Sequence, residues 1–139
     1  MLLFLREFAL GARMSFLPRK TILAIGAVVD VAMHSNKGPV SVRDLNDRLQ
    51  LPRRYLEPIL QALAREGILV GRHGPHGGYV LAKGRQAISV YDISEAVRTV
   101  KAKKEFRLLL PTLAQAEQCF ISALKRITVE DLVRTANYL

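Results

Sequence analysis

The chain has 139 residues, half of them hydrophobic, and carries a formal net charge of +9. This length fits one domain that buries its own core without disulfides or a structural metal, and the hydrophobic content excludes a largely disordered chain. With a single cysteine, Cys119, no disulfide can form within the chain, which suits a reducing, cytoplasmic compartment. A basic surplus of this size predicts a polyanionic partner or an anionic membrane surface.

The positive charge is concentrated in the middle of the chain. Arg43 to Arg85 includes eight lysines and arginines and four acidic residues. Arg98 to Arg107 includes five lysines and arginines and one acidic residue. After residue 107 the basic and acidic residues balance. We therefore expect the partner to contact the middle segment and the neutral C-terminal segment to have another role.

Two apolar runs near the N-terminus resemble targeting segments only superficially. The opening MLLFLREFALGAR is broken by Arg6 and Glu7 and lacks a basic n-region, unlike a signal peptide. The run TILAIGAVV stops at Asp30, far short of the roughly 20 residues of a membrane span. The sequence predicts a soluble protein that is not exported.

The first predicted elements are helices. Apolar residues recur at three- and four-residue steps from Arg19 to His34, as in a buried helix. A second helix is expected after Ser41, which would act as N-cap and form a capping box with Asp44. The pattern of residues 51–67 predicts a third helix, and Gly67 lies where its C-terminal cap is expected.

Two prolines interrupt this third helix. Pro52 fits a first helical position, whereas Pro58 lacks the N–H group that an interior residue donates. We therefore expect Pro58 to kink the helix or to delay its regular part, so that residues 52–57 form a separate, tilted first turn.

A glycine-rich hairpin is expected next. The runs ILVGR (68–72) and YVLAK (79–83) are strand-like and flank a tip of glycine, proline and histidine. Further helices are expected over residues 88–100, capped by Ser89; from about Leu108 to Leu124; and from Thr128 onward, with Asp131 in the first turn.

Helix, turn, helix and hairpin in this order are typical of a winged helix-turn-helix. The third helix of such a fold enters a major groove through its first turn, which here carries Arg53, Arg54 and Tyr55. A guanidinium group there can bind guanine or phosphate. The simpler alternative is that both arginines are solvated charges at an exposed helix end.

The hairpin tip allows two interpretations. Glycines would let backbone amides approach phosphates while Arg72, His73, His76 and Lys83 supply positive charge. An ordinary tight turn explains two glycines, but less easily four with flanking cations. A nucleotide-binding phosphate loop is disfavoured, because no Lys-Ser or Lys-Thr pair follows and a strand comes next.

At these residues the sequence resembles the Rrf2 family of bacterial winged helix-turn-helix transcriptional regulators, which includes iron–sulphur cluster regulators and nitric-oxide-sensing repressors. The resemblance runs from about Met14 to Leu132 and is carried by ILAIGAVVDVAMH, GPVSVRDLNDRLQLPRRYLEPILQALAREGIL, HGPHGGYVLAK, ISVYDISEAV and ITVEDL. It implies a mainly α-helical fold with a small β-hairpin, in which a winged helix-turn-helix DNA-binding domain (14–100) precedes a dimerisation helix and a C-terminal helix (101–139). It also implies a homodimer, paired through residues 108–124, that binds a palindromic operator in double-stranded DNA, most simply as a repressor.

The resemblance also implies which residues contact DNA. Carried over residue by residue, these positions are Ser41, Arg53, Arg54, Tyr55, Arg72, His73, Gly74, His76 and Gly77. His73 stands where the family commonly has an arginine before Gly-Pro, so this contact is shifted to Arg72 or sensitive to pH. Pro58 replaces a residue that in many relatives continues the recognition helix. Residues 1–13 precede the start of the resemblance, as an extension that results from an upstream start codon or forms an added helix.

No cofactor is expected. Family members that bind a cluster place three cysteines between the fourth helix and the dimer helix, whereas RTVKAKKEFRLLLP contains none, and one thiolate cannot hold an iron–sulphur cluster. We interpret Cys119 as a small buried hydrophobe, with a redox thiol or an intersubunit disulfide as alternatives. His73 and His76 have no nearby carboxylate or thiol that would complete a zinc site.

The sequence contains no nucleophile elbow, paired carboxylates or metal motif, so we do not expect an enzyme. A DNA-binding transcriptional regulator is the favoured function. One alternative is a winged-helix protein-interaction module whose basic face meets an acidic partner without specific DNA binding. Another is a peripheral membrane protein that uses residues 1–13 as an interfacial helix.

Overall fold

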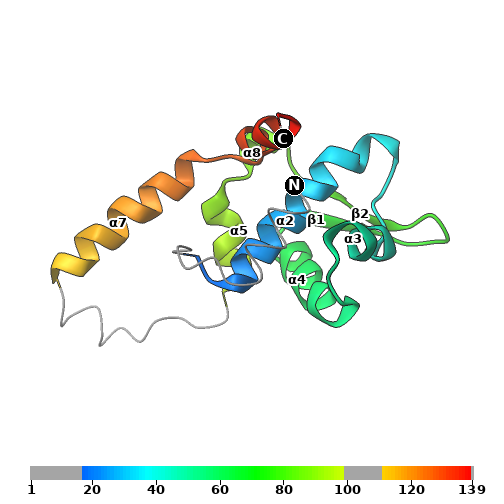
Figure 1. The fold of residues 1–139 in the computed structure, drawn as a ribbon, viewed down its shortest axis with the longest axis horizontal. Helices are drawn as coiled ribbons and strands as arrows, with labels where there is room; N and C mark the ends of the chain where they lie inside the picture. The colour runs from blue at the N-terminus through cyan, green and yellow to red at the C-terminus, as the bar shows by residue number, and fades with distance from the viewer. Residues whose placement is uncertain (1–16, 99–110, 139) are drawn as a thin grey trace.

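The computed structural model describes residues 17–98 and 111–138. Their elements, shown in Figure 1, are α2 (Arg19–His34), α3 (Val42–Leu49), α4 (Arg53–Arg65), β1 (Leu69–Arg72), β2 (Gly78–Leu81), α5 (Val90–Val97), α7 (Pro111–Arg126) and α8 (Val129–Asn137), with short 3₁₀ helices at Ser35–Lys37 and Arg85–Ala87. The expected fold class, mainly α-helical with one small hairpin, is confirmed. The expectations for residues 1–13 and 101–110 lie outside the described residues.

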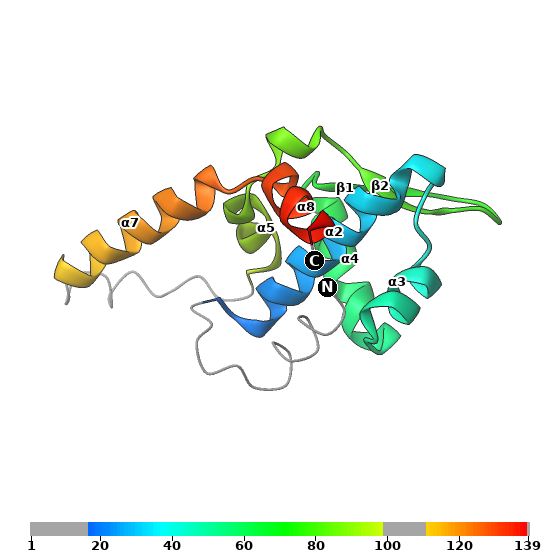
Figure 2. The same cartoon turned by 45° about the horizontal axis from the view of Figure 1, so that its top comes forward.

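Helix α2 occupies the centre of the core. It packs against α3, α4, α5, α8 and β2, and Ala24, Ala27, Val28 and Val31 have no exposed surface. Because neighbours surround this helix, it is apolar on almost every face. Helix α8 returns to α2 and places Val129 and Val133 in the same core (Figure 2). Helix α7 instead projects from the body and contacts it mainly through α5.

Helix α4 runs through Pro58 without interruption. The expected separate first turn over residues 52–57 is therefore wrong, and Pro52 is the N-cap rather than the first helical residue. Pro58 removes the hydrogen bond that an ordinary residue would donate to the Arg54 carbonyl. Both residues lie on the exposed side of the helix, where water can bind this carbonyl, so the helix continues.

The C-terminal end of α4 confirms the role expected of Gly67. This residue has φ +73, and its N–H donates to the Ala64 carbonyl at 3.1 Å. The next N–H, that of Ile68, donates to the Leu63 carbonyl at 2.9 Å. This pair of bonds is the Schellman motif, in which glycine adopts the left-handed conformation without strain.

Three helices begin with the cap residue that the sequence predicts. At α5, Ser89 and Asp92 form a complete capping box, and Thr128 and Asp131 form another at α8. At α3, the Ser41 hydroxyl accepts the Asp44 N–H at 3.1 Å but donates to the Asp44 carboxylate at 2.8 Å. The capping box expected there is wrong, because the carboxylate binds the hydroxyl instead of the N-cap N–H.

The later helices differ from expectation only at their ends. Helix α5 ends at Val97 rather than at residue 100, and α7 extends to Arg126 rather than to Leu124. A contact that we did not expect joins the starts of α5 and α8. The Val90 N–H donates to the Ile127 carbonyl at 2.8 Å, and the Val129 N–H donates to the Ile88 carbonyl at 2.9 Å.

The capping box of α8 makes stability depend on pH. Hydrogen bonds from the Thr128 backbone and hydroxyl hold the pKa of Asp131 below its usual value of 3.8. A lowered folded-state pKa adds stability above the unfolded-state value, and this stability is lost as pH falls through the folded-state value. We expect Asp131→Asn to be less stable than the wild type at pH 7, with the difference shrinking below pH 4.

Thermal unfolding of both proteins at pH 7 and pH 3 measures this effect. Asp47→Asn on α3 is the matched control, because only the Asp47 carbonyl, which the substitution keeps, contacts a cap residue, Gln50. An equal difference between wild type and Asp131→Asn at the two pH values would contradict the prediction.

Candidate nucleic-acid interface

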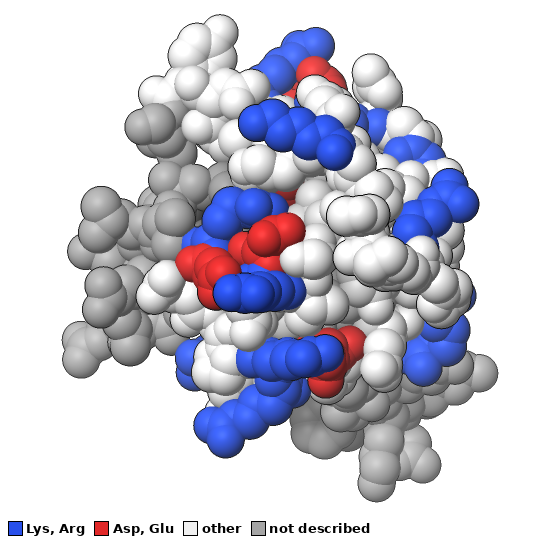
Figure 3. Space-filling view, turned by 90° about the vertical axis from the view of Figure 1, so that its right-hand side faces the viewer, with Lys and Arg blue, Asp and Glu red and all other residues white. Residues whose placement is uncertain are grey.

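One side of the molecule carries α3, the start of α4 and the hairpin. Figure 3 views this side, on which lysine and arginine side chains are spread over the surface and outnumber the acidic ones. Arg43, Arg53, Arg54 and Arg72 are all exposed. The basic middle segment of the sequence therefore includes a basic surface built from three elements.

The hairpin, called the wing below (residues 69–81), is fixed to the start of α3. Its strands pair antiparallel, with Leu69 opposite Leu81 and Arg72 opposite Gly78. Val40 bridges to β2, because its N–H donates to the Tyr79 carbonyl at 2.9 Å and the Tyr79 N–H donates back at 2.8 Å. Strands are recognised in a sequence by alternating apolar and polar residues, and a single bridging residue has no such pattern. The Val40 contact was therefore not predicted.

The wing glycines have structural roles within the protein. A Cβ at Gly78 would lie 2.3 Å from the Val40 carbonyl oxygen, and one at Gly77 would lie 2.3 Å from that of Arg72. Gly74 has φ +109, which favours glycine. Close packing or backbone conformation thus accounts for three of the four glycines between Val70 and Tyr79. The absence of bulky side chains is not by itself evidence of nucleic-acid contact.

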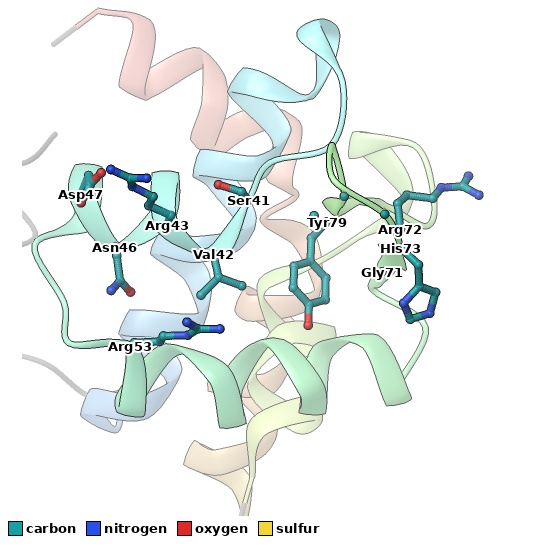
Figure 4. Close-up of a pocket in the computed structure, with 13 residues that line it drawn as sticks. Ser41, Val42, Arg43, Asn46, Asp47, Arg53, Gly71, Arg72, His73 and Tyr79 are labelled. Atoms are coloured by element: carbon teal, nitrogen blue, oxygen red, sulfur yellow. The ribbon is translucent and has the colours of Figure 1, made fainter.

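A groove of about 610 Å³ separates the wing from α3 and the start of α4 (Figure 4). One wall consists of Ser41, Val42, Arg43, Asn46, Asp47 and Arg53, and the other of Gly71, Arg72, His73, Gly74, Gly77, Gly78 and Tyr79. Six sequence-predicted site residues are therefore brought together: Ser41, Arg53, Arg72, His73, Gly74 and Gly77. Arg54, Tyr55 and His76 do not line the groove.

The first turn of α4 presents three exposed side chains. Arg53 Nε donates to Glu57 Oε1 at 2.6 Å, one helical turn along. The Arg54 guanidinium carbon lies 5.0 Å from the centre of the Tyr55 ring, which is cation–π geometry. Tyr55 is half exposed, at 51%. An aromatic ring left in solvent beside a guanidinium group is available to a ligand.

A buried ion pair that sequence analysis missed holds α3 against α2. The Asp30 side chain is 2% exposed and accepts from Arg48 Nε at 3.0 and 3.1 Å and from Nη2 at 2.8 Å. Its hydrogen bond and charge raise the pKa of Arg48 above the usual value. Asp30 was interpreted only as the end of an apolar run. A lone acidic residue within an apolar helix is the signal for a buried partner.

Cys119 lies on α7 and is exposed, so its interpretation as a buried hydrophobe is wrong. The projection of α7 from the body explains this exposure, because Leu124 is the buried residue among positions 114–126. The described ranges contain no group of three His, Cys, Asp or Glu residues able to hold a metal ion. They also contain no helix long and apolar enough to cross a membrane.

The arrangement of α3, α4 and the wing defines a winged helix-turn-helix protein of the class that binds nucleic acid. A family model named Rrf2 and described as "Iron-dependent Transcriptional regulator" matches residues 17–135. The chain belongs to the Rrf2 family of transcriptional regulators, so the family that the sequence resembles is confirmed.

Individual relatives agree with this assignment. The HTH-type transcriptional regulator IscR of Erwinia tasmaniensis is 39% identical over 74 residues, which cover 53% of this chain and 45% of that protein. IscR of Yersinia pestis matches with the same identity and coverage. The chain thus spans about half the length of the curated relatives it matches.

Solved structures extend the likeness over most of the chain. T. potens IscR superposes with a TM-score of 0.73 at 28% identity and covers 92% of this chain and 90% of its own. B. subtilis CymR, described as the global cysteine regulator, has a TM-score of 0.73 at 22% identity, and the match covers 88% of this chain and 98% of that chain. The second comparison supports the fold alone.

The cysteine content of the chain does not fit an iron–sulphur cluster as the basis of the iron dependence that the family description names. The chain has one cysteine, on a projecting helix, whereas an iron–sulphur cluster is held by about four ligands. The iron-dependent chemistry of the family description is therefore not assigned to this chain.

Proposed function

We propose that the chain binds a palindromic operator as a homodimer and acts as a repressor. The first turn of α4 would enter a major groove, and the wing would reach the adjacent minor groove or backbone. The observation that carries this proposal is the basic groove whose two walls are linked by the Val40–Tyr79 hydrogen bonds. Because the wing is joined through the backbone to the start of α3, and α3 packs against α4, the reading helix and the wing would meet DNA in a fixed relation.

We propose Arg53, Arg54 and Tyr55 as contacts in the major groove. The ring of Tyr55 supports the Arg54 guanidinium, which reduces the side-chain entropy lost on binding. Arg53 uses Nε for Glu57 and retains other N–H donors for guanine or phosphate. The ion pair with Glu57 also offsets part of its charge, so binding to DNA of any sequence is weakened.

We propose Ser41, Arg72, His73, Gly74, His76 and Gly77 as contacts along the backbone and minor groove. Arg72 and His73 line the groove, and His76 is exposed at the tip. The Gly77 N–H already donates to the Gly74 carbonyl at 3.0 Å. Gly77 would therefore act through close approach of the chain rather than by donating its amide to phosphate.

Dimerisation is proposed through α7. This helix projects from the body and carries exposed Phe120 and Cys119. A symmetric pair would place two α4 helices on half-sites about one or two helical turns of DNA apart. A pair of chains would bind such a site more tightly than one chain does.

Fluorescence anisotropy with duplexes tiled across the upstream region of the gene tests the proposal. We expect one duplex to bind at least about a hundredfold tighter than the others, with two chains bound per duplex. The double variant Arg53→Ala, Arg54→Ala should lose this preference, because it lacks both guanidinium groups of the first turn.

The matched control is Arg65→Ala, Arg134→Ala. It removes the same charge from exposed positions on α4 and α8 that do not line the groove. Equal binding to all duplexes, lost near physiological salt, would contradict the proposal and favour the protein-interaction alternative.

A further inference from the structure

The wall of the groove opposite the wing contains a cation that the sequence did not single out. Arg43 lies in the first turn of α3 and is exposed. Figure 4 shows Arg43 and Arg72 on opposite sides of the groove. We propose that Arg43 is a phosphate contact for the sugar–phosphate strand that this groove would hold, on the wall opposite Arg72. The inference rests on the proposed function and adds a residue and a ligand class to it.

The charges of the groove favour an anion. Neither Arg43 nor Arg72 forms an ion pair with a carboxylate in the part of the chain that the structure describes, whereas Arg53 is bound to Glu57 at 2.6 Å. Asp47 is the acidic residue of the lining and lies four residues after Arg43 on the same helix. Three arginines and one aspartate leave the groove positive, and two of the arginines have no carboxylate partner among the described residues. A phosphodiester strand has the complementary charge.

The shape of the groove suits a backbone strand better than a base edge. Its wing wall includes Gly71, Gly74, Gly77 and Gly78, so much of this wall is bare main chain. The Val40–Tyr79 bonds of 2.8 and 2.9 Å set the separation of the two walls before any ligand binds. A pre-formed site loses less conformational entropy on binding.

The order of the helices and the wing also places a strand of the DNA backbone in the groove. In a helix-turn-helix the second helix lies in the major groove, and the first helix crosses the backbone. Helices α4 and α3 are these second and first helices, and the wing lies beyond them. A strand that passes from the major groove under α4 to the minor groove under the wing must run between α3 and the wing.

The ligand class has a measurable consequence. A phosphate contact strengthens binding to every sequence and adds to its salt dependence, whereas a base contact changes preference. We expect Arg43→Ala in the full chain to weaken binding to the tightest duplex and to an unrelated duplex by the same factor, about 5- to 10-fold. The slope of log K against log salt should fall by about 0.9.

Two matched variants accompany this measurement. Arg134→Ala removes the same charge from α8, outside the groove, and should change affinity less than twofold. Arg43→Lys keeps the charge and should retain most of the affinity. Thermal unfolding of each variant shows whether it is folded.

The outcomes separate this inference from the proposed function. If Arg43→Ala binds like Arg134→Ala while Arg53→Ala, Arg54→Ala loses preference, the phosphate strand is not in the groove although the regulator binds DNA. If Arg43→Ala changes the preference between duplexes, Arg43 reads bases and the inference is wrong. If the wild type binds no duplex, both proposals fail.

Discussion

Replacing Arg48 by methionine is expected to lower the free energy of unfolding by about 3 kcal/mol, because it leaves the buried Asp30 carboxylate without its partner. The Asp30 side chain is 2% exposed and accepts three hydrogen-bond contacts from Arg48. We expect the lower end of the range for broken buried pairs, since the Arg48 side chain is itself 33% exposed. Chemical denaturation of both proteins at pH 7 measures the difference.

Arg43→Met is the matched control for this substitution. It makes the same chemical change on the same helix, at an exposed residue without a carboxylate partner in the described ranges, and should alter stability by less than about 0.5 kcal/mol. The double variant Asp30→Leu, Arg48→Met removes both charges and should recover much of the loss. Equal stability of Arg48→Met and Arg43→Met would show that the ion pair does not hold α3 in place.

Replacing Gly78 by alanine is expected to separate the wing from α3. The added Cβ would lie 2.3 Å from the Val40 carbonyl oxygen, a backbone atom that cannot rotate away. Overpacking of about 1–3 kcal/mol adds to the loss of two backbone hydrogen bonds worth about 1 kcal/mol each. We therefore expect a total loss of about 3–5 kcal/mol, measured by thermal unfolding, and at least tenfold weaker binding to the tightest duplex.

Gly71→Ala is the control within the same wing. Its Cβ would lie 3.7 Å from a Tyr79 ring carbon, an ordinary van der Waals distance, so stability should change little. If Gly78→Ala unfolds at the same temperature as Gly71→Ala, the close approach to Val40 does not fix the wing.

Local signals predicted most of the fold. Ser89 and Thr128 identify helix starts because their side chains satisfy N–H groups within three residues, and Gly67 identifies an end because its left-handed conformation is local. Pro58 misled the prediction because its effect depends on whether the freed Arg54 carbonyl reaches water. That condition depends on tertiary packing rather than on the proline itself.

The candidate interface was predicted only in part. Arg53, Arg72 and His73 were expected from motif and resemblance, and the structure places them on one groove. Arg43 was missed because its position on the groove depends on how α3 docks against the wing. That docking uses main-chain bonds between Val40 and Tyr79, and the Asp30–Arg48 ion pair separately holds α3 against α2. Neither contact leaves a periodic pattern.

The bridge between the starts of α5 and α8 affects the order in which the chain can fold. Val129 and Val133 complete a core whose central helix, α2, comes from the other end of the described chain. During synthesis the N-terminal helices must wait, with this part of their apolar surface uncovered, until α8 has emerged. Closing so long a loop is entropically unfavourable and slows folding. The two backbone bonds at residues 88–90 and 127–129 would then be among the last to form.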